Sequence, residues 1–142
     1  MQNNGQIVKF LIEKGAEGQV SDLLMLAVRY GKELIESVKV LVNKGADVNK
    51  VSGPLEYPYV KDSVLIIAAQ NNYMKIVKFL LEKGANVQAT CHSRSWCLGK
   101  NILMYAATHG NLDIVKLAVT KGLDVNAQDK VDGSTALMMA AK

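Results

Sequence analysis

The sequence has few of the residues and runs that mark membrane, secreted or disulfide-rich proteins. Its 142 residues include only two prolines and two cysteines, and its longest apolar runs are short ones such as 23–28 and 64–69. A membrane span needs about 18 apolar residues in a row, and the first residues lack the basic start and apolar stretch of a signal peptide. We therefore expect no membrane partner and a cytoplasmic protein, with export into a host cell left open.

The sequence also lacks the residue sets that carry catalysis. No paired carboxylates stand out near a histidine, there is no glycine-rich phosphate loop, and no Ser-His-Asp set suggests itself. The aspartates of the polar connections are interpreted as turn residues; they are Asp47, Asp124, Asp129 and Asp132. We expect that the chain is not an enzyme and holds no cofactor.

The formal net charge of +4 would suit nucleic acid, but the placement of the lysines argues against that partner. They recur at two fixed offsets: Lys9, Lys39, Lys78 and Lys116 at one, and Lys14, Lys44, Lys83 and Lys121 at the other. Charges that repeat with the architecture are typical of the solvated face of each unit. A nucleic-acid partner is therefore not favoured.

Four segments of the chain resemble one another. They read IVKFLIEKGAEGQ from Ile7, SVKVLVNKGADVN from Ser37, IVKFLLEKGANVQ from Ile76 and IVKLAVTKGLDVN from Ile114. Paired apolar residues at helical spacing predict an amphipathic helix in each segment. Every helix then reaches Lys-Gly, where glycine adopts the left-handed conformation that ends a helix at little cost. We interpret these segments as the second helices of a helical hairpin.

A second set of segments alternates with the first. It reads LLMLAV from Leu23, VLIIAA from Val64, ILMYAA from Ile102 and ALMMAA from Ala136. All are apolar, with alanine at the same late positions, and small side chains there let neighbouring helices approach closely. Short polar links at 70–73 and 108–111 follow two of them. These segments are predicted to be first helices.

The combined pattern resembles the ankyrin repeat, whose period is 33 residues. The closest stretches are 44–49, 76–87, and 122–129 followed by 133–137. The resemblance covers nearly the whole chain and implies an all-α solenoid of stacked antiparallel helix pairs joined by β-hairpins or long loops. It places helix pairs at 22–45, 63–84 and 101–122, flanked by half repeats at 1–15 and 134–142, in a single domain over 1–142. Because a unit cannot bury its apolar face alone, we expect a segment of a longer array, or ends that pair with another chain.

The sequence departs from the family pattern in two ways. The glycines that end the second helices, Gly15, Gly45, Gly84 and Gly122, are 30, 39 and 38 residues apart. The two intervals longer than the family period of 33 residues place insertions after Asn49 and after Gln88. The proline and histidine of the family's TPLH signature are also absent from every unit, so the first helices are expected to start less sharply. Insertions of this kind map to loops on one face of the array, often the binding face.

The resemblance implies a binding surface formed by hairpin loops and the exposed ends of the first helices. On this chain the helix ends carry Arg29, Tyr30, Gln70, Asn71, Thr108 and His109, which vary while their neighbours repeat. The long loops 50–61 and 89–100 add Tyr57, Tyr59, Arg94 and Trp96, residue types that dominate interface hot spots. An alternative is that the two loops pack on each other, with Trp96 buried against Tyr57 or Tyr59.

Cys91, His92 and Cys97 form a separate group in the second loop. Thiolates and imidazole are zinc ligands, yet the spacing is not a familiar one and no fourth ligand is near in sequence. Two cysteines flanking a five-residue turn could also form a disulfide. Free thiols are the default in a cytosolic chain. The sequence thus predicts a protein–protein interaction module, with a metal- or redox-responsive element at these residues or a passive spacer as alternatives.

Overall fold

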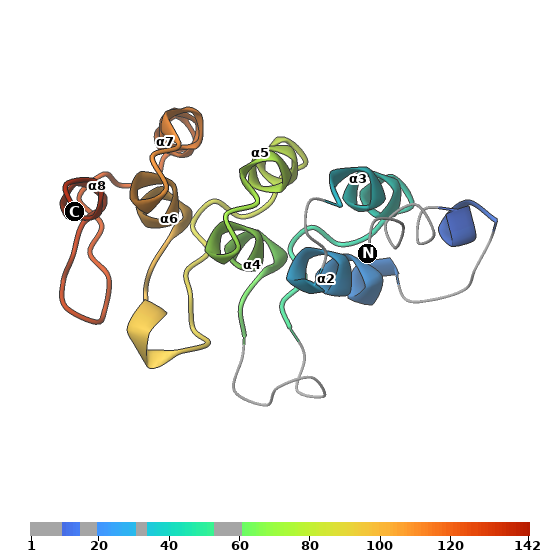
Figure 1. The fold of residues 1–142 in the computed structure, drawn as a ribbon, viewed down its shortest axis with the longest axis horizontal. Coiled ribbons are helices and arrows are strands. Elements are labelled where there is room, and N and C mark those ends of the chain that lie inside the picture. The colour runs from blue at the N-terminus through green and yellow to red at the C-terminus, as the bar shows by residue number, and fades with distance from the viewer. Residues whose placement is uncertain (1–9, 15–19, 31–33, 53–60) are drawn as a thin grey trace.

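Figure 1 shows the computed structural model of the chain, which describes residues 10–14, 20–30, 34–52 and 61–142. Apart from a short helical segment at 10–13, its elements are α2 (Val20–Tyr30), α3 (Ile35–Asn43), α4 (Val64–Gln70), α5 (Met74–Glu82), the 3-10 turn η1 (Ser95–Cys97), α6 (Ile102–Thr108), α7 (Leu112–Thr120) and α8 (Ala136–Ala140). The predicted fold class, a solenoid of stacked helix pairs, is confirmed. The limits of a single domain over 1–142 stay a prediction.

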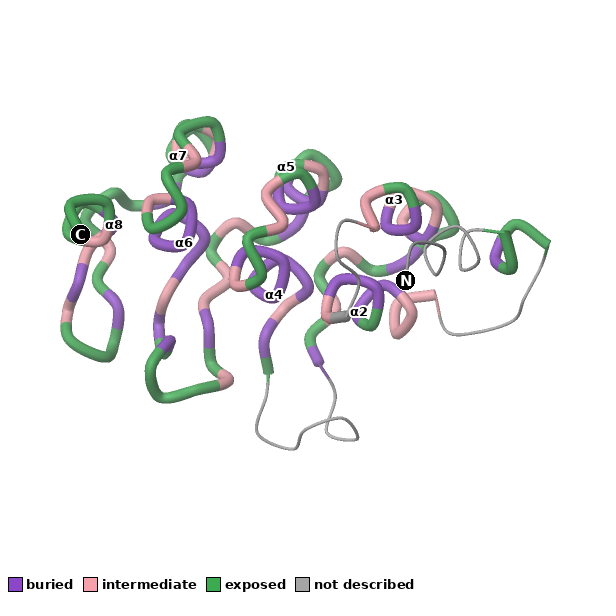
Figure 2. The backbone as a smooth tube through the Cα atoms, in the orientation of Figure 1, coloured by how far each residue is buried: buried purple, intermediate pink, exposed green. Residues whose placement is uncertain are grey.

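The helices form two rows, with the apolar core between them. Figure 1 shows α2, α4, α6 and α8 in the inner row and α3, α5 and α7 in the outer row, with loops projecting from the inner row. The buried stretches of the tube in Figure 2 face the space between the two rows and between successive pairs. Packing joins each helix to its own partner and to its neighbour in the next pair, for example α2 with α4 and α5 with α7. The stack is therefore held by contacts between adjacent units.

The inner helices α4, α6 and α8 begin sharply, which corrects for them the expectation drawn from the missing proline and histidine. Ser63 precedes α4, Asn101 precedes α6 and Thr135 precedes α8, and each side chain accepts a hydrogen bond from a backbone N–H three residues on. These bonds satisfy donors that a helix start otherwise leaves unpaired. Side-chain caps at the preceding residue thus replace the family's usual start signal.

The outer helices end where the Lys-Gly pattern predicts. After α5, Gly84 adopts φ of +89° and the next N–H, that of Ala85, bonds back to Leu80 O at 2.9 Å. Only glycine adopts this conformation without strain. The chain then leaves the helix row and enters the projecting loop.

The bases of the projecting loops are linked from unit to unit. Asn49 accepts a 2.7 Å hydrogen bond from Asn86 N and donates to Gly84 O, and Gln88 donates to Gly122 O one unit later. Each loop also closes through one antiparallel bridge: Val51 with Ser63, Thr90 with Asn101, and Gln128 with Thr135. These bonds fix the spacing of the loops along the array.

No helix in the described part of the chain has the length and apolar character needed to cross a membrane.

Candidate functional site

The second long loop, 89–100, folds back on itself into a closed structure. The Cys91 N–H donates to Lys100 O at 2.8 Å and the Gly99 N–H donates to Cys91 O at 2.9 Å. The turn η1 forms the tip, where the Cys97 N–H donates to Arg94 O. The loop therefore has a defined backbone, as a preorganised contact surface requires.

Cys91 and Cys97 are joined by a disulfide across this loop, with their Cα atoms 5.8 Å apart. The expectation of free thiols was wrong, because the folded loop brings the two sulphur atoms within bonding distance. The metal alternative has no support: both sulphur atoms are bonded to each other, and in the part of the chain described here no three His, Cys, Asp or Glu side chains gather as a metal site. His92 is exposed, and its Nδ1 lies 2.8 Å from Thr90 O.

A buried carboxylate that the sequence did not reveal holds this loop in place. Asp62 lies at the base of the first long loop and is almost fully buried. Its carboxylate accepts a 2.6 Å hydrogen bond from the His92 N–H and a 3.1 Å bond from Gln70 Nε2. Its backbone oxygen accepts from the Ser52 N–H at 3.1 Å. Asp62 thus connects both loop bases to the end of α4.

Gln70 and Tyr105 complete this buried polar cluster. Gln70 Nε2 also donates to the sulphur of Cys91 at 3.2 Å, so the predicted contact residue Gln70 serves the interior of the fold. The Tyr105 hydroxyl is buried and has no hydrogen-bond partner among the described residues. Burial raises the pKa of Tyr105 to about 12; Gln70 opposes the rise and the nearby Asp62 carboxylate adds to it.

Trp96 stands at the tip of the loop with 52% of its surface exposed. Arg94 lies over one side of the indole, its Cζ 5.7 Å from the ring centroid, and Lys100 Nζ lies 5.9 Å from the same ring. Both distances are in the range of cation–π attraction. The alternative in which Trp96 is buried against the first loop does not fit this exposure.

The loop is also fixed to the next projecting loop along the array. The Lys130 N–H donates to Leu98 O at 2.8 Å. Gly99 packs so closely there that a Cβ atom would lie 2.7 Å from Lys130 Cγ and 2.8 Å from Lys130 N. The loop that carries Trp96 is therefore supported by the next projecting loop, which contains Lys130.

The remaining predicted contact residues are dispersed. Tyr57 and Tyr59 of the first loop lie outside the described residues, as does the side chain of Tyr30. Arg29 is half-buried, whereas Asn71 and Thr108 are exposed. The side chains of Asn71 and Thr108 make hydrogen bonds within the fold: Asn71 Nδ2 donates to Val28 O at 3.3 Å, and Thr108 Oγ1 donates to Met104 O at 2.9 Å. The helix ends thus combine exposed and structural residues, a distinction that sequence variation alone did not make.

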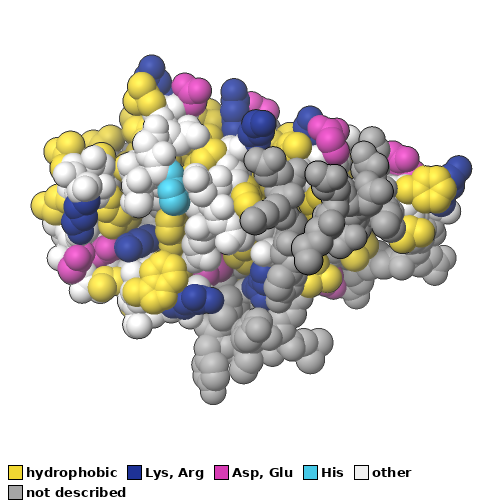
Figure 3. All heavy atoms as spheres, viewed as in Figure 1, with side chains coloured by type: hydrophobic (Ala, Val, Ile, Leu, Met, Phe, Trp, Pro, Cys, Tyr) yellow, Lys and Arg dark blue, Asp and Glu magenta, His cyan; other side chains and the backbone are white. Residues whose placement is uncertain are grey.

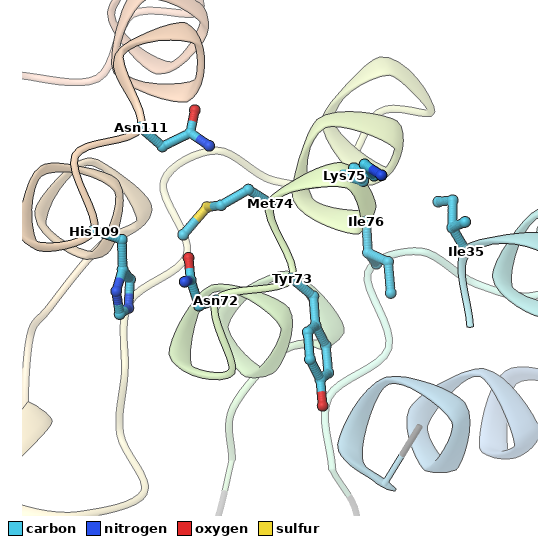
Figure 4. A pocket seen from close by; sticks show the side chains of 8 residues that line it. All are labelled: Ile35, Asn72, Tyr73, Met74, Lys75, Ile76, His109 and Asn111. Atoms are coloured by element: carbon cyan, nitrogen blue, oxygen red, sulfur yellow. The ribbon is translucent and has the colours of Figure 1, made fainter. Parts of the chain in front are cut away.

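His109 lines a hollow of about 420 Å³ at the links between inner and outer helices (Figure 4). In this view His109 and Asn72 extend into the space between the ends of α4 and α6, while Met74 and Asn111 lie above them. Asn72 has φ of +59°, a left-handed conformation that places the link around the hollow. One of the predicted contact residues, His109, therefore borders this hollow.

Six of the eight recurring lysines are exposed, as the charge pattern predicted, whereas Lys39 is half-buried and Lys9 lies outside the described residues. Charged side chains of both signs follow the upper edge of the molecule in Figure 3, along the outer helices. The exposed lysines of this edge are Lys44, Lys78, Lys83, Lys116 and Lys121. Their mixture with acidic side chains is typical of a solvated face.

Comparison with known proteins gives a match to one protein family and to several individual proteins. The family described as "Ankyrin repeats (3 copies)" matches residues 1–91 and again residues 65–142. A protein of Oryza sativa subsp. japonica named as a probable E3 ubiquitin-protein ligase, XBOS33, is 38% identical over 56% of this chain and 14% of its own length. The B-cell lymphoma 3 protein homolog of Mus musculus is 34% identical over 82% of this chain and 23% of its own length.

A third relative aligns over nearly the whole chain. The transient receptor potential cation channel subfamily A member 1 homolog of Caenorhabditis elegans is 26% identical over 95% of this chain and 10% of its own length. The chain spans between 10% and 25% of the lengths of six such curated relatives. What they share with it is the repeat array.

Proposed function

The chain belongs to the ankyrin repeat family, whose arrays are generally protein–protein interaction modules, and on that premise we propose that it binds a protein partner through the tip of loop 89–100. The exposed ends of the inner helices, which carry Arg29, Asn71, Thr108 and His109, supply further contacts. Tyr57 and Tyr59 of loop 50–61 are proposed as additional contacts. We assign the chain no catalytic role.

The observation that carries this proposal is a half-exposed tryptophan on a constrained loop. A large apolar ring in water is unfavourable, and a tryptophan buries much area on binding while losing little rotamer freedom. The disulfide and the Asp62 hydrogen bonds hold the loop before a partner arrives. The entropy cost of ordering the loop on binding is therefore small.

Arg94 and Lys100 define the chemistry of the partner. They place two positive charges around the indole. A complementary surface carries an apolar recess for the ring, bordered by carboxylates. We therefore propose an acidic protein surface with an apolar centre as the partner.

The test is quantitative capture of partners from the source organism with matched variants. Trp96→Ala and the double variant Arg94→Ala/Lys100→Ala should lose a partner that the unchanged chain retains, and Trp96→Phe should keep part of the affinity. The control is Lys78→Ala/Lys116→Ala, which removes two charges from exposed positions of α5 and α7. Loss by the control alone would move the site to the outer helices. Equal capture by all variants would refute the loop, and capture of nothing would favour the spacer alternative.

One observation favours a redox-responsive element as a second function. The disulfide lies within the proposed contact loop, and disulfides persist in oxidising compartments but open in a reducing cytosol. Reduction would release the tip that carries Trp96 from its base. Partner affinity measured with and without a reductant tests this: a fall on reduction supports redox control, and an unchanged affinity assigns the bond a purely structural role.

A further inference from the structure

Loop 121–135, which joins α7 to α8, lies directly against the loop that carries Trp96. Both loops project from the inner row of helices in Figure 1. The Lys130 N–H donates to Leu98 O, and Cβ and Cγ of Lys130 pack against Gly99. The residue after Gly99 is Lys100, one of the two cations beside the indole. The side chain of Lys130 therefore starts next to the charged border of the Trp96 tip.

Lys130 brings a further positive charge to this surface. The residue is exposed, although the first part of its side chain packs on Gly99. A lysine in this arrangement covers its neighbour with methylene groups and keeps its ammonium group in water. Two aspartates flank it in the same turn: Asp129 is buried, and Asp132 accepts a hydrogen bond from the Ser134 N–H at 3.0 Å. Cationic side chains thus border the tip from two successive loops.

Asp129 fixes the backbone that presents Lys130. Its Oδ1 accepts hydrogen bonds from the N–H groups of residues 131–133 at 3.1, 3.0 and 3.2 Å. The Asp129 N–H donates to Ser134 O at 3.0 Å, which closes the turn. A carboxylate is a stronger acceptor than a neutral oxygen, so three such bonds to one atom hold the turn in one conformation. The position of Lys130 beside Gly99 therefore depends on Asp129.

We propose that the surface that binds an acidic partner extends over both loops, with Lys130 as a further contact residue and Asp129 as the residue that positions it. The inference rests on the proposed function, because it requires that the partner binds at Trp96. A protein segment that places an apolar side chain on the indole then meets Arg94 and Lys100 on one loop and Lys130 on the next.

The contact between the two loops determines which acidic segments fit. Because Lys130 N–H is bonded to Leu98 O, the cations of both loops are held together before a partner arrives. The cost of ordering them on binding is correspondingly small. The site therefore selects a partner whose carboxylates extend over the width of two loops, in preference to one with a single acidic residue.

Trp96 supplies the readout, because it is the only tryptophan in the chain. The probe is a random copolymer of L-glutamate and L-leucine, which offers both carboxylates and apolar side chains. It is added at low ionic strength to the complete protein, since salt screens exposed charges. Binding at the tip should change the fluorescence emission of Trp96, so the titration gives a dissociation constant for this surface.

Lys130→Gln tests the contact residue. Glutamine removes the charge and keeps methylene groups that pack on Gly99, so the dissociation constant of the copolymer should rise about threefold, the effect of one exposed ion pair. The matched control is Lys116→Gln, at an exposed position of α7, which should bind like the unchanged chain.

Two substitutions test Asp129 as a positioning residue. Asp129→Ala should weaken copolymer binding about as much as Lys130→Gln does, and Asp129→Asn, which keeps one acceptor oxygen, should restore most of the affinity. The double variant Asp129→Ala/Lys130→Gln should bind no more weakly than Lys130→Gln, because both changes act through the same ammonium group. Asp124→Ala is the control in the same loop; Asp124 Oδ1 accepts from the Asn126 N–H at 2.9 Å.

The outcomes separate this inference from the proposed function. Unchanged Trp96 emission in the unsubstituted protein would mean that acidic segments do not bind at the tip, and both proposals would fall. Binding that Arg94→Ala weakens and Lys130→Gln leaves intact would retain the proposed function and overturn the extension to the second loop. Additive losses in the double variant would show that Asp129 acts through general stability and not through Lys130.

Quenching of Trp96 by small ions tests the shared charge without a partner. Iodide is attracted to a positive surface and caesium is repelled, so the ratio of their quenching constants at fixed ionic strength reports the charge around the indole. Lys130→Gln should lower this ratio in the same direction as Lys100→Ala, whereas Lys116→Gln should not. A ratio that Lys100→Ala lowers and Lys130→Gln leaves unchanged would place Lys130 outside the site and refute the proposal.

Discussion

The His92 N–H donates a 2.6 Å hydrogen bond to the carboxylate of Asp62, thirty residues earlier in the chain. This bond joins the bases of two successive long loops, and the same carboxylate accepts from Gln70 of α4. One buried acidic residue thereby sets the position of the loop that carries Trp96. The stability of this loop and its capacity to bind are consequently expected to change together when Asp62 is altered.

Replacing Asp62 tests this connection. Asp62→Ala leaves the His92 N–H and the Gln70 amide without an acceptor in a buried place, so the free energy of unfolding should fall by about 3 kcal/mol. Asp62→Asn retains one acceptor oxygen and should cost less. Urea unfolding followed by circular dichroism measures both. Asp113→Ala, at an exposed position of α7, is the control, with a loss of about 0.5 kcal/mol; an Asp62→Ala loss no larger than the control's would contradict the role given to Asp62.

The disulfide gives a second prediction. Cys91→Ala/Cys97→Ala removes a cross-link that closes a loop of seven residues, for which chain entropy predicts a loss of about 2 kcal/mol. The loop backbone should also become more mobile, seen as faster amide exchange at Gly99 and Lys100. When the unsubstituted protein is unfolded in denaturant and treated with an alkylating reagent, mass spectrometry should find neither cysteine modified until a reductant is added. Modification of both without reductant would show free thiols.

The buried hydroxyl of Tyr105 predicts a specific pH dependence. Its pKa is raised from about 10 to about 12 in the folded protein, so its contribution to stability is complete below pH 10 and is lost as the pH rises toward 12. At pH 11 the loss is about 1.4 kcal/mol. Tyr105→Phe has no ionising group at this position, so its free energy of unfolding should not show this loss. The difference in unfolding free energy between the native protein and Tyr105→Phe should therefore change by about 1.4 kcal/mol between pH 9 and pH 11. A constant difference across that range would contradict the raised pKa.

Gly99 offers a prediction with an internal control. Gly84 and Gly99 both have positive φ, but a Cβ at Gly84 meets nothing within 4 Å, whereas one at Gly99 collides with Lys130. Gly84→Ala should cost only the backbone strain, about 1 kcal/mol. Gly99→Ala should cost about 1 kcal/mol more, because two loops must separate. Thermal unfolding of both variants measures the difference, and equal losses would mean that the loops are not packed together.

Local patterns made the helices and their ends predictable. The spacing of Ile76, Val77, Leu80 and Leu81 depends on one face of one helix, and Gly84 ends that helix through its own conformation. Trp96 is exposed in an inserted loop, and its role as a contact residue stays a prediction. The sequence was sufficient here because each property depends on residues that are close in the chain.

Properties that depend on distant segments were not predictable. Asp62 is a single acidic residue beside a helix start, and only the folded loops show that the His92 N–H reaches it. The disulfide required the hairpin ladder that brings Cys91 opposite Lys100. Gln70 was predicted to contact a partner because it varies between units, yet its amide is used by Asp62 and Cys91. Variation identified a position but not the direction of its side chain.

The stacking of units only on their neighbours has a mechanical consequence. Asn49 and Gln88 link successive loop bases, and the helices contact those of the adjacent pairs. Under tension along its axis such a molecule behaves as springs in series, and each junction bears the whole load. Between α4 and α6 the hydrogen bonds of Asp62 add to the helix contacts, and between α6 and α8 the Lys130–Leu98 hydrogen bond does the same. The loop that presents Trp96 lies between these two reinforced junctions and should therefore keep its shape under load.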